Sequence, residues 1–171
     1  AFPDLEKITF WARNTEKAKI LINKISNLDI TIEVSSDIQL TSANADIIST
    51  ATMAHEPILK GEWVKPGTHI DLIGAFTSDM READDFLMSS GSIFVDSRAT
   101  TIEHIGELTI PISNGIISKN DIIGDFYDLI PSSKSGRKSN DEITIFKNGG
   151  GAHLDLMIAK YLIEISNNSI S

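Results

Sequence analysis

An arginine stands between an apolar run and a helical run in the segment WARNTEKA, Trp11 to Ala18. In a sheet that binds a dinucleotide, an acidic residue at the end of the second strand selects a free ribose 2′-hydroxyl, whereas a cation accommodates a 2′-phosphate. Here Arg13 follows a strand without Asp or Glu at its end, and Asn14 or Thr15 can cap a helix whose N-terminal amides favour an anion. The segment predicts NADP(H), with NAD(H) as the second choice; the alternative is a surface arginine beside an ordinary cap.

Two later segments offer backbone that a ligand can approach closely. In TATMAHEP, residues 50–57, small and hydroxylated side chains follow a strand, which suits a nicotinamide ribose or a pyrophosphate. A plain turn from strand to loop explains that segment equally well. In FKNGGGAHLDLMIAK, residues 146–160, three glycines precede a helix and can cradle a ligand, although a flexible hinge is the simpler interpretation.

Other chemistries find little support in the sequence. The chain has no cysteine, which excludes disulfides, thiolate metal sites and cysteine nucleophiles. No metal site is predicted, because no HExxH motif or other ligand spacing joins the histidines His55, His69, His104 and His153. The net charge of −9 without a basic run argues against nucleic acid and anionic lipid as partners. No apolar run reaches the roughly 18 residues of a membrane span, and we expect a cytoplasmic protein.

The elements that would position these segments alternate along the chain. Strands are predicted at residues 8–12, 30–34, 45–50, 69–76, 92–96 and 142–146, and helices at 15–25 and 37–43. A further helix is predicted from an N-cap at Asp79, with Glu82 completing a capping box, to about Ser90, and a last one follows the three glycines through Ile165. Several strands are continuously apolar, as buried parallel strands are, so we expect the α/β class with a mostly parallel sheet, helices on both faces and functional loops at one edge.

Taken in order, these segments resemble the ornithine cyclodeaminase/mu-crystallin family across nearly the whole chain. The series is FWARNTEKA, ADIISTATMAHEPIL, GEWVKPGTHIDLIGAF, MREADD, IFVDSRA, GELTIPISNG and GRKSNDEITIFKNGGGAHLDLMIAK. The resemblance implies a Rossmann-like domain at 1–150 and a C-terminal helix at 151–171 that packs on the family's N-terminal dimerisation and substrate domain. It also implies a homo-oligomer, typically a dimer, that acts on a small substrate derived from an amino acid.

The resemblance also assigns a cofactor site residue by residue. It places the adenosine 2′-phosphate near Ala12, Arg13, Asn14 and Thr15. It places the nicotinamide side near Thr50, Ala51, Thr52, Ile73 and Gly74, and the nicotinamide end near Asn148, Gly149 and Gly150. No catalytic residue is assigned, because the acid and the cations that hold the substrate carboxylate would lie on the N-terminal half, which the chain lacks.

One departure from the family concerns the activity. Ornithine cyclodeaminases carry a catalytic Asp where this chain has Phe76, and the string IGAFTSDMREADD looks more like reductases of cyclic imines such as pyrroline-2-carboxylate. We therefore expect the NADP(H)-binding part of a ketimine reductase. The alternatives are an ornithine cyclodeaminase with bound NAD, and a non-catalytic crystallin-like binding protein or inactive fragment.

A second departure concerns the sheet. The family's first Rossmann strand and its GxGxxA turn should come just before Ala1. In the strand order 3-2-1-4-5-6, that strand separates strands 2 and 4, here ITFWA and ADIIST. Each unpaired buried backbone group would cost about 1–3 kcal/mol, so we expect that the isolated chain is not a stable monomer. Either another polypeptide supplies the strand and the turn, or the two strands pair directly or with a second copy.

Overall fold

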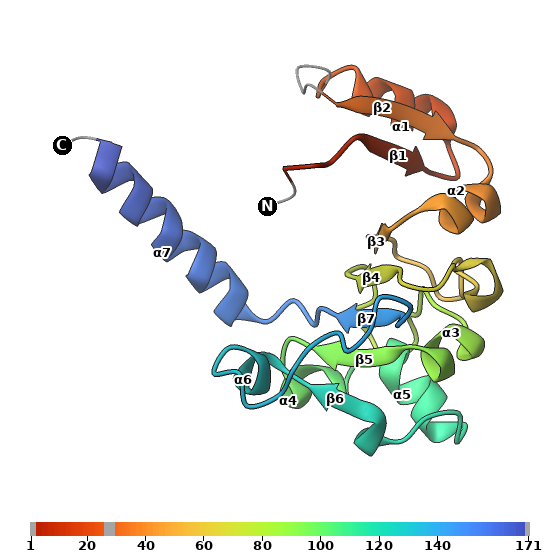
Figure 1. Ribbon diagram of the computed structural model, residues 1–171, viewed down its shortest axis with the longest axis vertical. Coiled ribbons are helices and arrows are strands. Elements are labelled where there is room, and N and C mark those ends of the chain that lie inside the picture. Colours follow the sequence, from red (N-terminus) through yellow and green to blue (C-terminus); the bar gives the residue numbers. More distant parts are fainter. Residues whose placement is uncertain (1–2, 26–29, 170–171) are drawn as a thin grey trace. The chain divides into compact units, whose positions relative to one another are not determined.

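The computed structural model describes residues 3–25 and 30–169 (Figure 1). The chain divides into two compact units. The first comprises Ala1–Ala45 with Trp63–Lys65, and the second comprises Asp46–Glu62 with Pro66–Ser171. Each of the two units contains a parallel sheet, so the predicted α/β class with a Rossmann-like parallel arrangement is confirmed.

The first unit is a small β-α-β-α structure. Its elements are β1 (Lys7–Trp11), α1 (Thr15–Ile22), β2 (Thr31–Ser35) and α2 (Ile38–Asn44). β1 and β2 pair in parallel, with Phe10 opposite Val34. The Asn14 side chain caps α1 by accepting a hydrogen bond from the Lys17 backbone N–H at 3.0 Å. The helix start that the sequence predicted is therefore confirmed, although α1 ends three residues before the predicted Ile25.

The second unit contains a five-stranded sheet in the order β3-β4-β7-β5-β6, and every neighbouring pair is parallel. The strands are β3 (Ile47–Thr50), β4 (His69–Leu72), β5 (Ser92–Val95), β6 (Ile122–Gly124) and β7 (Thr144–Lys147). The last of these strands in sequence, β7, therefore lies in the middle of the sheet (Figure 1). Ile70, Leu72, Val95 and Ile145 are fully buried, as expected for the continuously apolar strands.

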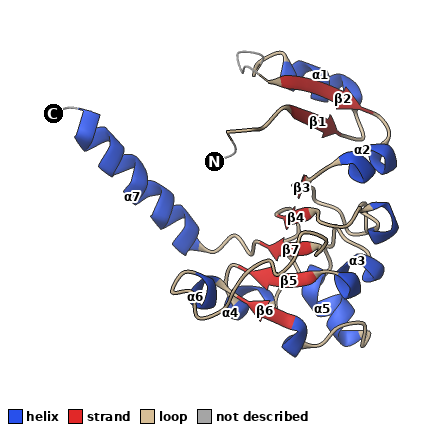
Figure 2. Cartoon of the chain, in the orientation of Figure 1, coloured by secondary structure: helices blue, strands red, loops and turns tan. Residues whose placement is uncertain are grey.

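Helical segments connect these strands, and one further helix follows the last of them (Figure 2). They are the 3-10 turns η1 (Gly61–Trp63) and η2 (Lys119–Asp121) and the helices α3 (Asp85–Ser90), α4 (Arg98–Thr101), α5 (Gly106–Ser113), α6 (Phe126–Leu129) and α7 (Ala152–Ser169). The sequence did not predict α4, α5, α6 or β6. In residues 3–25 and 30–169, none of the helices combines the length and the apolar character that crossing a membrane requires.

The predicted capping box at Asp79 and Glu82 is wrong. α3 begins after Asp84, whose carboxylate accepts a hydrogen bond from the Leu87 N–H at 2.8 Å. Asp79 instead accepts a bond from the Thr77 hydroxyl, and Glu82 is fully buried before the N-cap of α3. Several acidic residues lie close together here, and tertiary contacts decide which of them caps the helix.

β1 and β3, between which the Rossmann order places another strand, belong to different sheets. Among the described residues, β1 pairs with β2 and β3 pairs with β4, and no pairing joins β1 to β3. The pairs that do form, β2 with β1 and β3 with β4, are the neighbours that the Rossmann order requires.

Candidate functional site

The carboxyl ends of β3, β4 and β7 meet at one edge of the second unit's sheet, because the three strands are parallel neighbours. Thr50 is the partner of Leu72 in register, and Leu72 is the partner of Lys147. Backbone bonds continue past the strand ends, from Ile73 N–H to Thr50 O at 2.9 Å and from Asn148 N–H to Leu72 O at 3.1 Å. Three turns that the sequence singled out separately thus form one continuous edge.

Eight of the twelve predicted cofactor residues lie at this edge. They are Thr50, Ala51 and Thr52 after β3, Ile73 and Gly74 after β4, and Asn148, Gly149 and Gly150 after β7. The predicted strand through Phe76 ends earlier, at Leu72, because the chain turns away and the Gly74 N–H bonds to a side chain. Phe76 is 58 % exposed just beyond the turn.

The other four predicted residues, Ala12, Arg13, Asn14 and Thr15, belong to the first unit and follow β1. Arg13 is exposed, and it makes no ion pair with residues that the structure describes. Asn14 is committed to the cap of α1. A free guanidinium beside the first turn of a helix is a suitable arrangement for an anionic group.

Glu82 binds the turns after β3 and β4 together, and the sequence did not single it out for this role. Its Oε1 accepts hydrogen bonds from the Thr52 N–H at 2.6 Å and the Thr52 hydroxyl at 2.7 Å. Its Oε2 accepts from the Thr50 hydroxyl and the Gly74 N–H, both at 2.8 Å. Glu82 has no exposed surface, so one buried carboxylate satisfies four donors from two turns.

The backbone of Glu82 is held in turn by a second buried carboxyl group. Glu107, at the start of α5, accepts hydrogen bonds from the Glu82 N–H at 2.7 Å and the Ala83 N–H at 2.9 Å. Burial raises the pKa of Glu107 to about 7, against the lowering effect of these two backbone bonds. The segment that carries Glu82 is therefore fixed at both its main chain and its side chain.

A buried lysine lies among these acids. The Lys147 ammonium, at the end of β7, donates a hydrogen bond to the Leu72 carbonyl at 2.8 Å. Burial lowers the pKa of Lys147, while attraction to Glu107, Glu82 and Asp96 raises it. Glu82, Asp96, Glu107 and Lys147 are all 0 % exposed, so the Lys147 ammonium is a positive charge buried with three carboxyl groups.

Asp96 follows β5 at the same edge. Its Oδ1 accepts a bond from the Ser97 N–H at 2.7 Å, whereas its buried Oδ2 has no hydrogen-bond partner among the described residues. A Cβ atom at Gly149 would lie 3.1 Å from Asp96 Oδ1 and 2.8 Å from a Thr101 methyl group. Glycine at this position therefore allows the turn after β7 to lie against β5 and α4.

The raised pKa of Glu107 leads to a prediction about stability and pH. The pKa of Glu107 is about 7 in the folded protein, whereas its ordinary value is 4.5. The contribution of Glu107 to the free energy of unfolding is therefore fully present below pH 4.5 and is lost as the pH rises through about 7. We expect the free energy of unfolding to fall by up to about 3 kcal/mol on this account. Glu107→Gln should flatten that fall in urea titrations at pH 5 and pH 7.

The matched control is Glu103→Gln. Glu103 is exposed, and its bond with Lys119 lowers its pKa, so its contribution has the opposite sign. The control variant should not flatten the fall of the free energy of unfolding between pH 5 and pH 7. If the free energy of unfolding of Glu107→Gln falls between pH 5 and pH 7 as much as that of the unsubstituted protein, Glu107 is ionised in the folded protein throughout this range.

A Rossmann-like sheet with small residues and glycines at its carboxyl edge is typical of proteins that bind nucleotides. The sequence matches the profile of the ornithine cyclodeaminase/mu-crystallin family over residues 1–169, and the chain belongs to this family. The family that the sequence segments predicted is thereby confirmed.

Proteins similar to this chain include one curated protein and two solved structures. A Delta(1)-pyrroline-2-carboxylate reductase of Paracoccus denitrificans is 51 % identical over 163 residues, which cover 95 % of this chain and 52 % of that protein. The solved Delta(1)-pyrroline-2-carboxylate reductase of Thermococcus litoralis, in complex with NADH and L-proline, is 32 % identical with a TM-score of 0.80, over 85 % of this chain and 45 % of that one. A solved archaeal alanine dehydrogenase dimer with bound NAD is 30 % identical with a TM-score of 0.85, over 96 % and 51 %. The chain thus spans about half the length of the relatives that it matches.

Proposed function

We propose that the chain is the cofactor-binding part of a ketimine reductase that reduces a cyclic imine 2-carboxylate of the pyrroline-2-carboxylate type with NADP(H). The observation that carries this proposal is the edge formed by Thr50–Thr52, Gly74 and Asn148–Gly150, which follows three parallel strands. Identity of 51 % to a reductase of that substrate supports the choice of reaction.

The residues at the edge fit a nicotinamide group. Gly74 leaves no room for a side chain, because a Cβ there would lie 2.0 Å from the Thr52 carbonyl oxygen, so the turns after β3 and β4 present a smooth backbone surface. Thr52 and Asn148 are half-buried at that surface. The bound cofactor would supply a hydride to the imine carbon, and a proton would reach the ring nitrogen from an acid outside this chain. This chain's own share is to orient the cofactor and exclude water.

A complementing partner is part of the proposal. We propose that an N-terminal half supplies an additional strand with its glycine turn, or that β1 and β3 pair with strands of a second copy. The chain spans about half of its relatives, which is consistent with such a partner. The assembly of the chain with that partner is called the reconstituted protein below.

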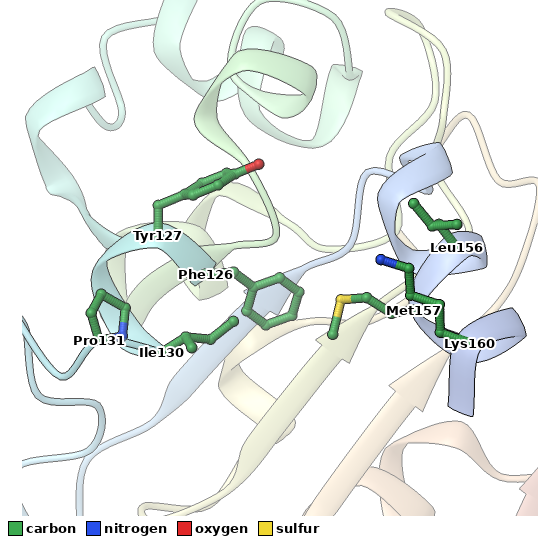
Figure 3. Close-up of a pocket in the computed structure, with 7 residues that line it drawn as sticks. All are labelled: Phe126, Tyr127, Ile130, Pro131, Leu156, Met157 and Lys160. Carbon is green, nitrogen blue, oxygen red and sulfur yellow. The ribbon is translucent and has the colours of Figure 1, made fainter. Parts of the chain in front are cut away.

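The last helix, α7, supports an interface with the same partner, as expected for residues 151–171. Its large apolar residues are mostly exposed: Leu156, Met157, Ile158, Tyr161, Leu162, Ile163 and Ile165. Two of them, Leu156 and Met157, line an apolar cavity of about 350 Å³ together with Phe126 of α6 and Ile130, which follows α6 (Figure 3). Exposed apolar surface of this kind marks an interaction site, and we assign it to the family's second domain.

The cofactor preference can be tested at Arg13. We expect Arg13→Ala to weaken NADPH binding by about 1.5–3 kcal/mol, roughly 10- to 150-fold, and to leave NADH binding unchanged, because a charge-assisted contact to the 2′-phosphate is lost. Calorimetry on the reconstituted protein measures both affinities. Lys24→Ala, which removes another exposed cation of the first unit, should change neither. Equal affinities for the two cofactors before and after the Arg13 substitution would rule out the preference.

The reaction can be tested with two substrates. We expect the reconstituted protein to oxidise NADPH with pyrroline-2-carboxylate and to release no ammonia from ornithine, because Phe76 replaces the acid of the cyclodeaminases. Absorbance of NADPH and an ammonia assay follow the two reactions. Proline and ammonia from ornithine at an enzymatic rate would favour the cyclodeaminase, and binding of NADPH without either turnover would favour a binding protein.

A further inference from the structure

The edge at the carboxyl ends of β3, β4 and β7, which we assign to the nicotinamide group, is called the nicotinamide edge below. The side chain of Glu82 lies behind this edge and organises it. Of the four donors that Glu82 accepts, two are backbone N–H groups, of Thr52 and Gly74, and these set the path of the two turns. The Thr50 hydroxyl also points to Glu82 and is buried, so it is committed to the carboxylate and not to a ligand. The shape that the edge offers a cofactor is therefore fixed from the inside.

The bonds to both turns use both oxygens of the Glu82 carboxyl group. Each oxygen of Glu82 receives two donors, one pair from Thr52 and the other from Thr50 and Gly74. A glutamine of the same length has one oxygen that accepts and one nitrogen that only donates, so it can serve one turn but opposes the N–H of the other. A shorter aspartate keeps the charge but cannot reach both turns.

We propose that Glu82 is a positioning residue of the cofactor site, one that holds the turns after β3 and β4 in the geometry that the nicotinamide ring requires. The inference rests on the function proposed above. Hydride transfer needs the reacting atoms about 3–3.5 Å apart, and a misplacement of about 1 Å can cost about a hundredfold in rate. Glu82 has no exposed surface through which to contact a ligand, and it would act through Thr52 and Gly74. Glu107 supports it by holding the main chain of residues 82 and 83.

The experiment compares Glu82→Gln and Glu82→Asp with a matched core variant, Ile93→Ala, in the reconstituted protein. Ile93 is 1 % exposed in β5, where its register partners are Ile122 of β6 and Ile145 of β7, so we expect its substitution to lower stability without changing the turns that Glu82 holds. NADPH fluorescence gives the affinity, thermal unfolding gives the stability, and steady-state kinetics separate kcat from KM. We expect both Glu82 variants to bind NADPH about tenfold or more weakly and to lose kcat, whereas Ile93→Ala melts at a lower temperature with unchanged affinity.

A measurement without any substitution tests the same idea. In the cofactor-free protein, the amide protons of Thr52 and Gly74 should already exchange slowly with deuterium, because Glu82 holds them before a ligand arrives. Free exchange that slows only on NADPH addition would show that the cofactor orders the turns, and would overturn the role of Glu82.

The other outcomes are equally decisive. Wild-type affinity in Glu82→Gln, or an equal loss in Ile93→Ala, would reduce Glu82 to an ordinary structural residue. If the Glu82 variants do not fold, the hydrogen-exchange measurement alone decides whether Glu82 holds the two turns before the cofactor binds. Failure of the unsubstituted reconstituted protein to bind NADPH or NADH would instead refute the proposed function, which keeps the two failures distinct.

Discussion

Replacement of Lys147 by methionine is expected to lower the free energy of unfolding by about 3–5 kcal/mol. Methionine preserves much of the length of the side chain but removes the buried ammonium that Glu107, Glu82 and Asp96 attract. The carboxyl groups would then be buried without a counter-charge, and the Leu72 carbonyl would lose its donor. Urea unfolding of the reconstituted protein measures the change.

Lys119→Met is the control for this prediction. Lys119 forms an exposed ion pair with Glu103, and such pairs contribute about 0–1 kcal/mol. A loss below about 1 kcal/mol in Lys147→Met as well would mean that the buried acids become protonated without cost when the lysine is absent. Combining Lys147→Met with Glu107→Gln should recover part of the loss, because the double variant buries one fewer potential charge.

Gly74→Ala is expected to abolish measurable NADPH binding and to destabilise the protein by about 1–3 kcal/mol or more. The added Cβ would lie 2.0 Å from the Thr52 carbonyl oxygen, 2.2 Å from the Thr52 nitrogen and 2.4 Å from Glu82 Oε1. Two of these atoms are backbone, so the methyl group must separate the turns after β3 and β4. Separation breaks the bonds that both turns make to Glu82, and the surface that the nicotinamide would contact is lost.

Gly136→Ala provides the matched glycine control, because a Cβ there meets nothing within 4 Å. It should leave both NADPH affinity and the unfolding free energy unchanged. Calorimetry and urea unfolding on the two variants give the comparison. Retained NADPH affinity in Gly74→Ala would place the cofactor away from the turn after β4 and would refute the assignment of Ile73 and Gly74 to its site.

The sequence correctly predicted the features that depend on residues close together in the chain. The apolar β-branched runs at 30–34 and 45–50 predicted strands, and the structure forms them within two residues of those bounds. Asn14 caps α1 as a short polar side chain can, through an N–H three residues ahead. The order of the segments predicted the family, which the match over residues 1–169 confirms.

The predicted helix cap was wrong because several acidic residues near the helix start could each have served as the cap. Asp79, Asp84 and Asp85 all offer an acidic side chain near a helix start, and the sequence pattern favoured Asp79 with Glu82 as its partner. In the structure Asp84 caps the helix and Glu82 is buried. The short elements α4, α5, α6 and β6 were missed because three to eight residues give too little periodicity to recognise.

By itself the sequence determined the class of fold, the strand-end turns and the family, because strand propensity, helix capping and motif order are properties of neighbouring residues. Only the tertiary structure decided that β7 lies in the middle of the sheet, and that Glu82, Glu107 and Lys147 are buried together. Residues 82 and 147 are far apart in the chain, and a glutamate or a lysine in a polar stretch is ordinarily exposed. Strand order brings their backbones close, and only then does a buried charge find the partners that make its burial tolerable.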